Sequence, residues 1–166
     1  MRVLGIDPSS QATGYGIIES KDGEYSVLDY GAVKPPRKSS LPEKLLHIKT
    51  GIAALISRHR PDEIAVENPF FAKNIRTAIT LGQVRGAVLV SVAEAGTPLF
   101  EYSPLEIKKA VTGYGRAEKG QVGVMIRTLL GIDDEKMEED AADALACAFC
   151  HINTRLFLRN LDESGY

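Results

Sequence analysis

Four carboxylates in this sequence stand at positions that suggest shared chemistry. Asp7 and Glu67 each end a short apolar run of the kind that fills a buried strand. Asp140 and Asp143 are three residues apart among alanines, so a helix would carry both side chains on one face. Each acid alone has an ordinary explanation as a turn, cap or surface residue. Because four such explanations must hold together, one site where the four acids converge is the more economical interpretation.

Such a cluster predicts hydrolytic chemistry that depends on a divalent metal. Four carboxylates cannot stay ionised together without cations, and hard oxygen ligands suit Mg²⁺ or Mn²⁺. Two ions about 3.5–4 Å apart would activate a water and stabilise the leaving oxygen of a phosphodiester. Cys147 and Cys150 have a CxxC spacing, but their apolar surroundings favour core thiols over zinc or redox chemistry. We expect His47 and His59 on the surface of a helix.

Length and composition indicate an ordinary globular protein. The chain has 166 residues, 44% of them hydrophobic and 25% charged. We expect one domain over residues 1–160 and a short tail at 161–166. Two cysteines exclude a disulfide framework. The chain shows neither a signal-peptide pattern nor an uninterrupted apolar run of roughly 18 residues, so we expect a cytoplasmic protein without a membrane span.

The net charge of −2 conceals an uneven distribution. Residues 34–60 contain seven Lys or Arg and one acid, and residues 133–143 contain seven acids and one Lys. This pattern is typical of a basic face and an acidic pocket, although two solvated surfaces would give it as well.

The elements that must position the acids alternate between strands and helices. Short connections predict three sequential antiparallel strands within residues 2–33. Further strands are expected at Ile64–Glu67 and Leu99–Tyr102. Helices are expected at Leu41–Arg60, Ile75–Ala95, Pro104–Val111, Ala117–Leu130 and from about Asp140, which would cap the last one. This order indicates an α/β fold, a mixed five-stranded sheet with helices on both faces.

The segment Ile75–Ala95 is apolar almost all round, which predicts a helix that is buried on two sides. Gly82 and Gly86, four residues apart, give it one flat face. A partner subunit and deep burial within the monomer explain this pattern equally well. In the preceding loop, we expect one of Phe70 and Phe71 to pack in the core and the other to be exposed for contact.

The chain resembles the RuvC family of Holliday junction resolvases over essentially its whole length to about Arg155. The resemblance depends on ordered motifs that are spread through one domain. They are Gly5-Ile6-Asp7-Pro8, Thr13-Gly14-Tyr15-Gly16, Ala65-Val66-Glu67, Phe70-Phe71-Ala72-Lys73-Asn74, Leu81-Gly82-Gln83-Val84-Arg85-Gly86, Ala117-Glu118-Lys119, Arg127-Thr128-Leu129-Leu130 and Asp140-Ala141-Ala142-Asp143-Ala144-Leu145-Ala146.

This resemblance implies a ribonuclease H-like fold and a homodimeric endonuclease that nicks four-way DNA junctions symmetrically, leaving 3′-hydroxyl and 5′-phosphate ends. It implies Mg²⁺ as cofactor, with Mn²⁺ able to substitute and two ions per subunit, and RuvA and RuvB as branch-migration partners. The four acids would be the catalytic metal ligands. The residues implied to bind DNA are Phe70, Lys73, Arg76, Lys108 and Lys119, and those implied at the dimer interface are Gly82 and Gly86.

Three positions depart from the family pattern. Ser9 stands where glycine is usual, Gln11 where a basic residue is frequent, and Asn68-Pro69 where a Gln-aliphatic pair is usual. They bear on affinity and sequence preference and leave the four acids untouched.

Three other functions make different predictions. A ribonuclease H-like enzyme acting on RNA would cut linear RNA as readily as a junction. A nucleotide phosphotransferase predicts a second domain and a glycine-rich turn after Asp7. An inactive junction-binding module predicts missing acids.

Overall fold

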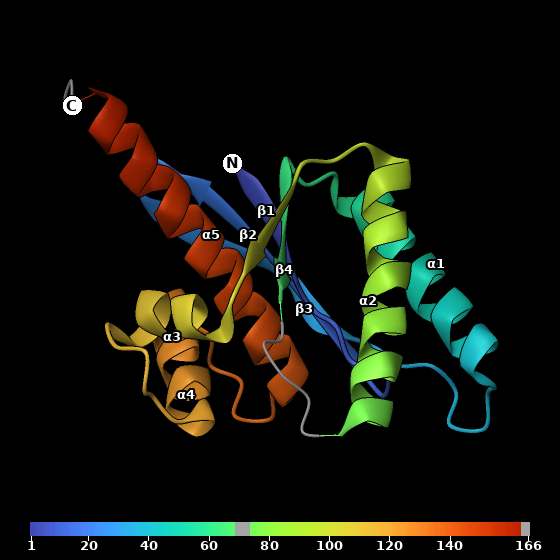
Figure 1. Cartoon of the computed structure of the whole chain (residues 1–166). Coiled ribbons are helices and arrows are strands. Elements are labelled where there is room, and N and C mark those ends of the chain that lie inside the picture. Colours follow the sequence, from blue (N-terminus) through green and yellow to red (C-terminus); the bar gives the residue numbers. More distant parts are fainter. Residues whose placement is uncertain (69–73, 164–166) are drawn as a thin grey trace.

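The computed structural model describes residues 1–68 and 74–163 (Figure 1). Phe70, Phe71 and Lys73 therefore lie outside the described residues. One five-stranded sheet has the strand order β3-β2-β1-β4-β5. Its strands are β1 (Arg2–Asp7), β2 (Thr13–Lys21), β3 (Glu24–Val33), β4 (Glu63–Glu67) and β5 (Leu99–Tyr102).

The sheet is mixed, as predicted, and its topology places two of the acids at one edge. The first three strands pair antiparallel, whereas β4 runs parallel to β1 and β5 runs parallel to β4. Ile6 is in register with Val66, so the carboxyl ends of β1 and β4 are adjacent. Asp7 follows Ile6 and Glu67 follows Val66, so the two acids lie side by side at the ends of these central strands.

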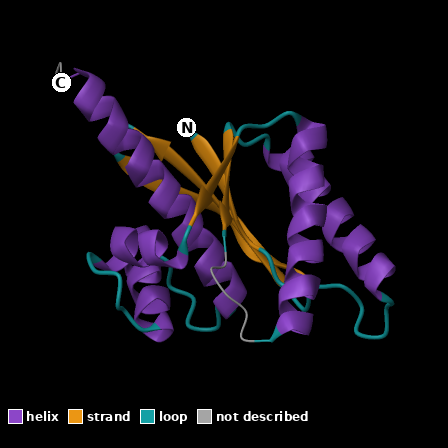
Figure 2. Ribbon diagram, viewed as in Figure 1, coloured by secondary structure: helices purple, strands orange, loops and turns teal. Residues whose placement is uncertain are grey.

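Helices cover both faces of the sheet (Figures 1 and 2). On one face α1 and α2 pack over a core that includes Leu4 and Val66. On the other face α3, α4 and α5 pack over a core that includes Val3 and Ala65. The helices are α1 (Leu41–His59), α2 (Ile75–Ala95), α3 (Pro104–Thr112), α4 (Lys119–Leu130) and α5 (Glu139–Glu163).

Glycines in β1 and β2 allow α5 to lie directly against the sheet. A Cβ atom at Gly5 would collide with the carbonyl oxygen of Ala144, and one at Gly14 would collide with the carbonyl oxygen of Asp140. Both oxygens belong to the helix backbone, which cannot swing aside as a side chain can. The close approach brings the first turns of α5 to the ends of β1 and β2.

Local details of α5 correct one prediction and confirm another. The helix begins at Glu139, so Asp140 lies in its first turn and is not its cap, which corrects our expectation. The carbonyl of Glu138 accepts the hydrogen bond from Ala142 N at 3.1 Å. Cys147 and Cys150 are buried free thiols, as predicted.

The two histidines of α1 differ from each other. His47 is exposed, as predicted. The expectation of a surface position is wrong for His59, whose side chain is 16% exposed and lies with Nε2 3.0 Å from Asp29 Oδ2 on β3. Strand pairing brought this acid to the end of α1 from a distant part of the chain.

Among residues 1–68 and 74–163, only one face of α2 is covered. Val84, Val88 and Val92 are buried toward α1 and the sheet, whereas Ile75 and Ile79 are 82% and 59% exposed. Deep burial within the monomer is therefore wrong. By length and composition α2 could cross a membrane, and 22% of it is buried within the described residues. That is weak evidence, since core helices of soluble proteins pass the same test.

Candidate active site

A pocket opens at the carboxyl ends of β1 and β4. Three of the four predicted acids line it, together with Lys108 and Lys119, two of the three lysines that were predicted to contact DNA. The apolar part of its wall comes from α3 and α4. Its lining residues are Asp7, Glu67, Pro104, Ile107, Lys108, Lys119, Val122 and Asp143. The structure thus brings together side chains from five elements, β1, β4, α3, α4 and α5, that are spread along the sequence.

Burial and mutual repulsion raise the pKa of both strand-end acids. For Asp7 the pKa is raised to about 8, first by burial and then by the charges of Glu67, Asp143 and Asp140, against the lowering effect of Lys119. For Glu67 burial and the charge of Asp143 raise the pKa to about 7. The pocket therefore has a deficit of positive charge, which disfavours the ionised forms of its own side chains.

Lys119 supplies part of the missing charge. Its Nζ lies 2.8 Å from Asp143 Oδ2 and 2.9 Å from Glu139 Oε1. Burial lowers the pKa of Lys119, but the hydrogen bonds to Asp143 and Glu139 outweigh burial and raise it overall. Glu139 was not a predicted site residue, because one more acid among seven between residues 133 and 143 gave no signal.

Asp140 stands apart from the other three acids. It is half-buried in the first turn of α5, beside Gly14, and is not among the pocket-lining residues. Its charge nevertheless acts on Asp7. Burial raises the pKa of both Asp140 and Asp143. The convergence predicted from the sequence is therefore tight for three carboxylates and looser for the fourth.

The donor set fits a hard divalent cation by atom type and charge. All its donors are carboxylate oxygens, the ligands that Mg²⁺ and Mn²⁺ prefer. Among residues 1–68 and 74–163, no three His, Cys, Asp or Glu side chains already stand in chelating geometry. Lys119 pairs with Asp143, and the acids repel one another. Binding of an ion would therefore require rotation of the side chains that brings their oxygens together.

The remaining predicted residues occupy different places. Arg76 is exposed in the first turn of α2, where its backbone N–H donates to the side chain of Asn74. Phe70 and Lys73 lie outside the described residues, as does Pro69. Ser9 closes the turn after Asp7, since its carbonyl accepts a hydrogen bond from Thr13 Oγ1 at 2.8 Å.

Comparisons with known proteins agree with this geometry. A family model described as "Crossover junction endodeoxyribonuclease RuvC" matches residues 3–151. The crossover junction endodeoxyribonuclease RuvC of Caldicellulosiruptor saccharolyticus is 46% identical over 153 residues, with 92% of each chain covered. That of Petrotoga mobilis is 44% identical over 166 residues, with 100% of each chain covered.

A solved structure, T. thermophilus RuvC in complex with Holliday junction substrate, is similar with a TM-score of 0.87 and 34% identity. It is matched over 94% of this chain and 96% of its own. Fold, sequence and family model thus agree over nearly the full length. The chain belongs to the RuvC family of crossover junction endodeoxyribonucleases.

Proposed function

We propose that this protein is a Holliday junction resolvase, an endonuclease that makes paired symmetric nicks in four-way DNA junctions during recombination and repair. The observation that carries the proposal is the pocket in which Asp7, Glu67 and Asp143 converge beside Lys108 and Lys119, in a chain of the RuvC family. The family and its junction-bound structural relative favour DNA over the RNA alternative.

The acids of the pocket would hold the cofactor. Asp7, Glu67 and Asp143, joined by Asp140, offer oxygen donors to Mg²⁺, or to Mn²⁺ in its place, with two ions per subunit. When bound, such ions activate water and stabilise the leaving oxygen of a phosphodiester. Burial first and then repulsion raise the pKa of Asp7 and of Glu67, and a bound cation would offset both effects by stabilising the ionised carboxylates.

The lysines have a separate task. Lys108 and Lys119 line the pocket with two positive charges that attract the phosphate of the strand to be cut. Ile107 and Val122, both nearly buried, form an apolar wall beside them.

DNA binding outside the pocket rests on three residues. Arg76 is exposed, so its side chain is accessible to a phosphate backbone. Phe70 and Lys73 stay predictions from the family resemblance, Phe70 as a residue that stacks on an unpaired base, which is worth ~1–3 kcal/mol. RuvA and RuvB as partners and a cytoplasmic location stay proposals of the same kind.

A homodimer through α2 would place two such pockets on one junction. The exposed face of α2 carries Ile75 and Ile79, and a Cβ atom at Gly82 or Gly86 would meet no described atom within 4 Å. Gly86→Glu therefore leaves room within the subunit while placing a charge on the proposed interface. We expect monomers in sedimentation velocity and loss of paired nicking; an unchanged dimer would place the interface elsewhere.

Cleavage of three substrates tests the function. A mobile four-way DNA junction, a linear DNA duplex and an RNA hairpin are incubated with the protein in Mg²⁺, in Mn²⁺ and in EDTA. We expect paired symmetric nicks in the junction alone, and none in EDTA. Junction binding without nicking would contradict the enzyme, and equal cutting of all three substrates would contradict junction selectivity.

A further inference from the structure

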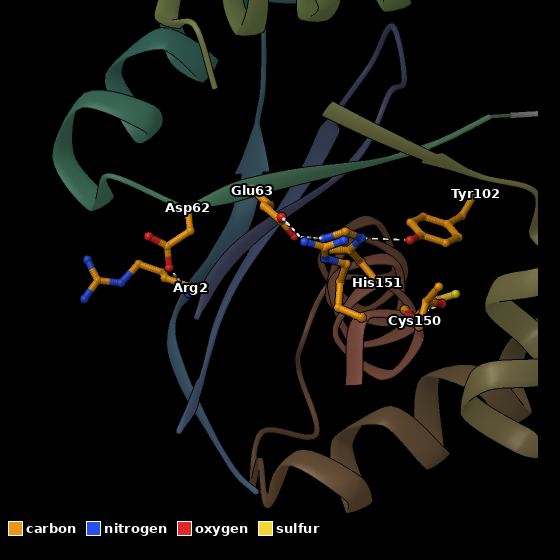
Figure 3. A network of polar contacts seen from close by, with 8 residues as sticks. Arg2, Asp62, Glu63, Tyr102, Cys150 and His151 are labelled. Carbon is orange, nitrogen blue, oxygen red and sulfur yellow. Dashed lines mark hydrogen bonds and ion pairs between the residues drawn. The ribbon is translucent and has the colours of Figure 1, made fainter. Parts of the chain in front are cut away.

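A polar network centred on buried His151 joins α5 to Glu63, at the start of β4, and to Tyr102, at the end of β5 (Figure 3). His151 on α5 is fully buried. Its Nδ1 lies 2.7 Å from the hydroxyl of Tyr102 at the end of β5, and its Nε2 lies 2.6 Å from Oε2 of Glu63 at the start of β4. One imidazole thus joins α5 to two neighbouring strands.

The network is satisfied without a charge on the imidazole. In the neutral tautomer with the proton on Nε2, the Nε2–H donates to the Glu63 carboxylate and Nδ1 accepts from the Tyr102 hydroxyl. Burial lowers the pKa of His151, although Glu63 opposes this effect. A buried group with both nitrogens satisfied is costly to move, because either displacement leaves a polar atom without its partner.

Arg155 and Phe100 reinforce the same connection. Arg155 Nη2 lies 3.1 Å from Oε1 of Glu63, so the second carboxylate oxygen is also held from α5. The guanidinium lies over the Phe100 ring with its carbon 5.6 Å from the ring centroid. The Phe100 ring in turn lies 4.6 Å from the His151 ring, centroid to centroid. Glu63 is therefore fixed by two residues one helical turn apart.

The network and the acids lie along the same two elements. Side chains alternate along a strand, so Glu63 and Glu67 are both directed to the α5 face of β4. They are four residues apart, which corresponds to about 13 Å along a strand. Asp143 and His151 are eight residues apart on α5, which corresponds to about 12 Å along a helix. The distance from Glu63 to Glu67 along β4 is therefore nearly equal to the distance from His151 to Asp143 along α5.

Between the His151 network and the acids, α5 contacts β4 through small residues. Ala65 on β4 faces the α5 side, where Ala144 and Ala148 approach the sheet closely enough to meet a Cβ added at Gly5. Such a contact excludes water but is not directional, unlike a hydrogen bond. The repulsion between Glu67 and Asp143 acts to separate the same two elements at the acidic end.

We propose that Glu63, His151 and Tyr102 are positioning residues, which fix α5 on the adjacent strands β4 and β5 so that Asp143 and Glu67 can bind the same metal ion. This inference rests on the proposed function of the acids as metal ligands. The three residues act through the backbones of α5, β4 and β5 and are not among the residues that line the pocket. Loss of the network shifts α5 relative to β4, and the ligands then meet an ion less well.

Substitutions at His151 separate its two contacts. An asparagine side chain ends near the position of Nδ1 and falls short of Glu63, whereas a glutamine side chain reaches the position of Nε2. We expect His151→Asn to weaken Mn²⁺ binding about tenfold, the range for residues that orient metal ligands, and His151→Gln to recover most of the affinity. Tyr102→Phe removes a single hydroxyl and is expected to fall between them.

Tyr25→Phe is the matched control. Its hydroxyl donates to Asn153 Oδ1 at 2.9 Å and so joins α5 to β3, which carries no acid of the pocket. Removing it takes one hydrogen bond from α5, as Tyr102→Phe does, but leaves the contact between α5 and β4. We expect Mn²⁺ binding within twofold of the unchanged protein.

The measurement is a titration of the DNA-free protein with Mn²⁺, followed by electron paramagnetic resonance of the free ion, at a temperature where every variant is folded by circular dichroism. Cleavage against Mn²⁺ concentration complements it: the half-saturating concentration should rise while the maximal rate stays within twofold. A wild-type protein that fails to bind Mn²⁺ overturns the proposed function. Wild-type binding with all variants equal to Tyr25→Phe overturns the positioning role.

Discussion

Strand β4 carries two glutamates on one face, and their electrostatic surroundings are opposite. Glu63 receives a hydrogen bond from buried His151 and an ion pair from Arg155. Glu67, four residues later, lies against Asp7 and Asp143, and its pKa is raised to about 7 by burial and by the charge of Asp143. Strand, face and residue type are the same, so only the surroundings differ.

The difference separates a carboxylate that belongs to the fold from one that is reserved for a ligand. At Glu63 the protein itself satisfies both oxygens, and no cation from solution is needed. At the other end the protein gathers carboxylates and provides too little positive charge of its own. A site that is electrostatically unfavourable when empty is favourable for a divalent cation.

The largest expected difference between Glu63 and Glu67 is in cleavage activity. Glu67→Gln removes a charged ligand, and we expect cleavage of a four-way junction to fall by more than about 10³-fold, since metal ligation is worth several kcal/mol in the transition state. Junction binding should persist within about threefold in a gel-shift assay. Glu63→Gln, which keeps one oxygen acceptor, is the matched control and should retain activity at saturating Mn²⁺. Equal loss in both variants would show that the two ends are not distinct.

Stability should change in the opposite sense. Glu63→Ala leaves the buried Nε2 of His151 without its partner, and we expect the free energy of unfolding to fall by about 1–3 kcal/mol in urea denaturation. Glu67→Gln, measured without metal at pH 8, should raise it, because the substitution removes repulsion in the pocket. If both substitutions lowered the free energy of unfolding, the result would contradict net repulsion at the Glu67 carboxylate.

The pH dependence of stability sharpens the same contrast. Asp7 and Glu67 have ordinary pKa values of 3.8 and 4.5 and folded values of about 8 and about 7. Between these values the folded state binds more protons than the unfolded state, so their contribution to stability falls as pH rises through this window and levels off above pH 8.

We expect the melting temperature of the metal-free protein to fall by a few degrees from pH 5 to pH 8, compared with an Asp7→Asn variant. Saturating Mg²⁺ should remove the difference, since it stabilises the ionised pair. Identical pH profiles of the two proteins would exclude Asp7 as the source of the slope.

The smallest effect concerns Lys119, a lysine of the pocket that pairs with Asp143. Its side chain is 57% exposed, so the pair is partly screened by solvent. Lys119→Met should lower the free energy of unfolding by about 1 kcal/mol or less without metal, and added Mn²⁺ should recover it in a thermal melt. Failure of Mn²⁺ to recover it would mean that ion and lysine do not share Asp143.

The sequence by itself determined which residues could do the chemistry. Apolar runs that end in Asp7 and Glu67, and the spacing of Asp140 and Asp143 among alanines, already indicated a carboxylate site, because strand and helix periodicity is a local property of the chain. The mixed sheet and its helices on both faces followed from the order of the same elements. Most boundaries agree with the structure to within a few residues.

Only the tertiary structure decided how these groups are partnered. The pairing of Lys119 with Asp143 and Glu139, the looser place of Asp140, the open face of α2 and the contact of His151 with Glu63 all join segments distant along the chain. No local pattern encodes which face of a helix meets which strand, and His151 stood in an apolar stretch without any sign of its partners. Pairing depends on packing of the whole sheet, which is why the two glutamates of β4 look equivalent in the sequence and differ in the fold.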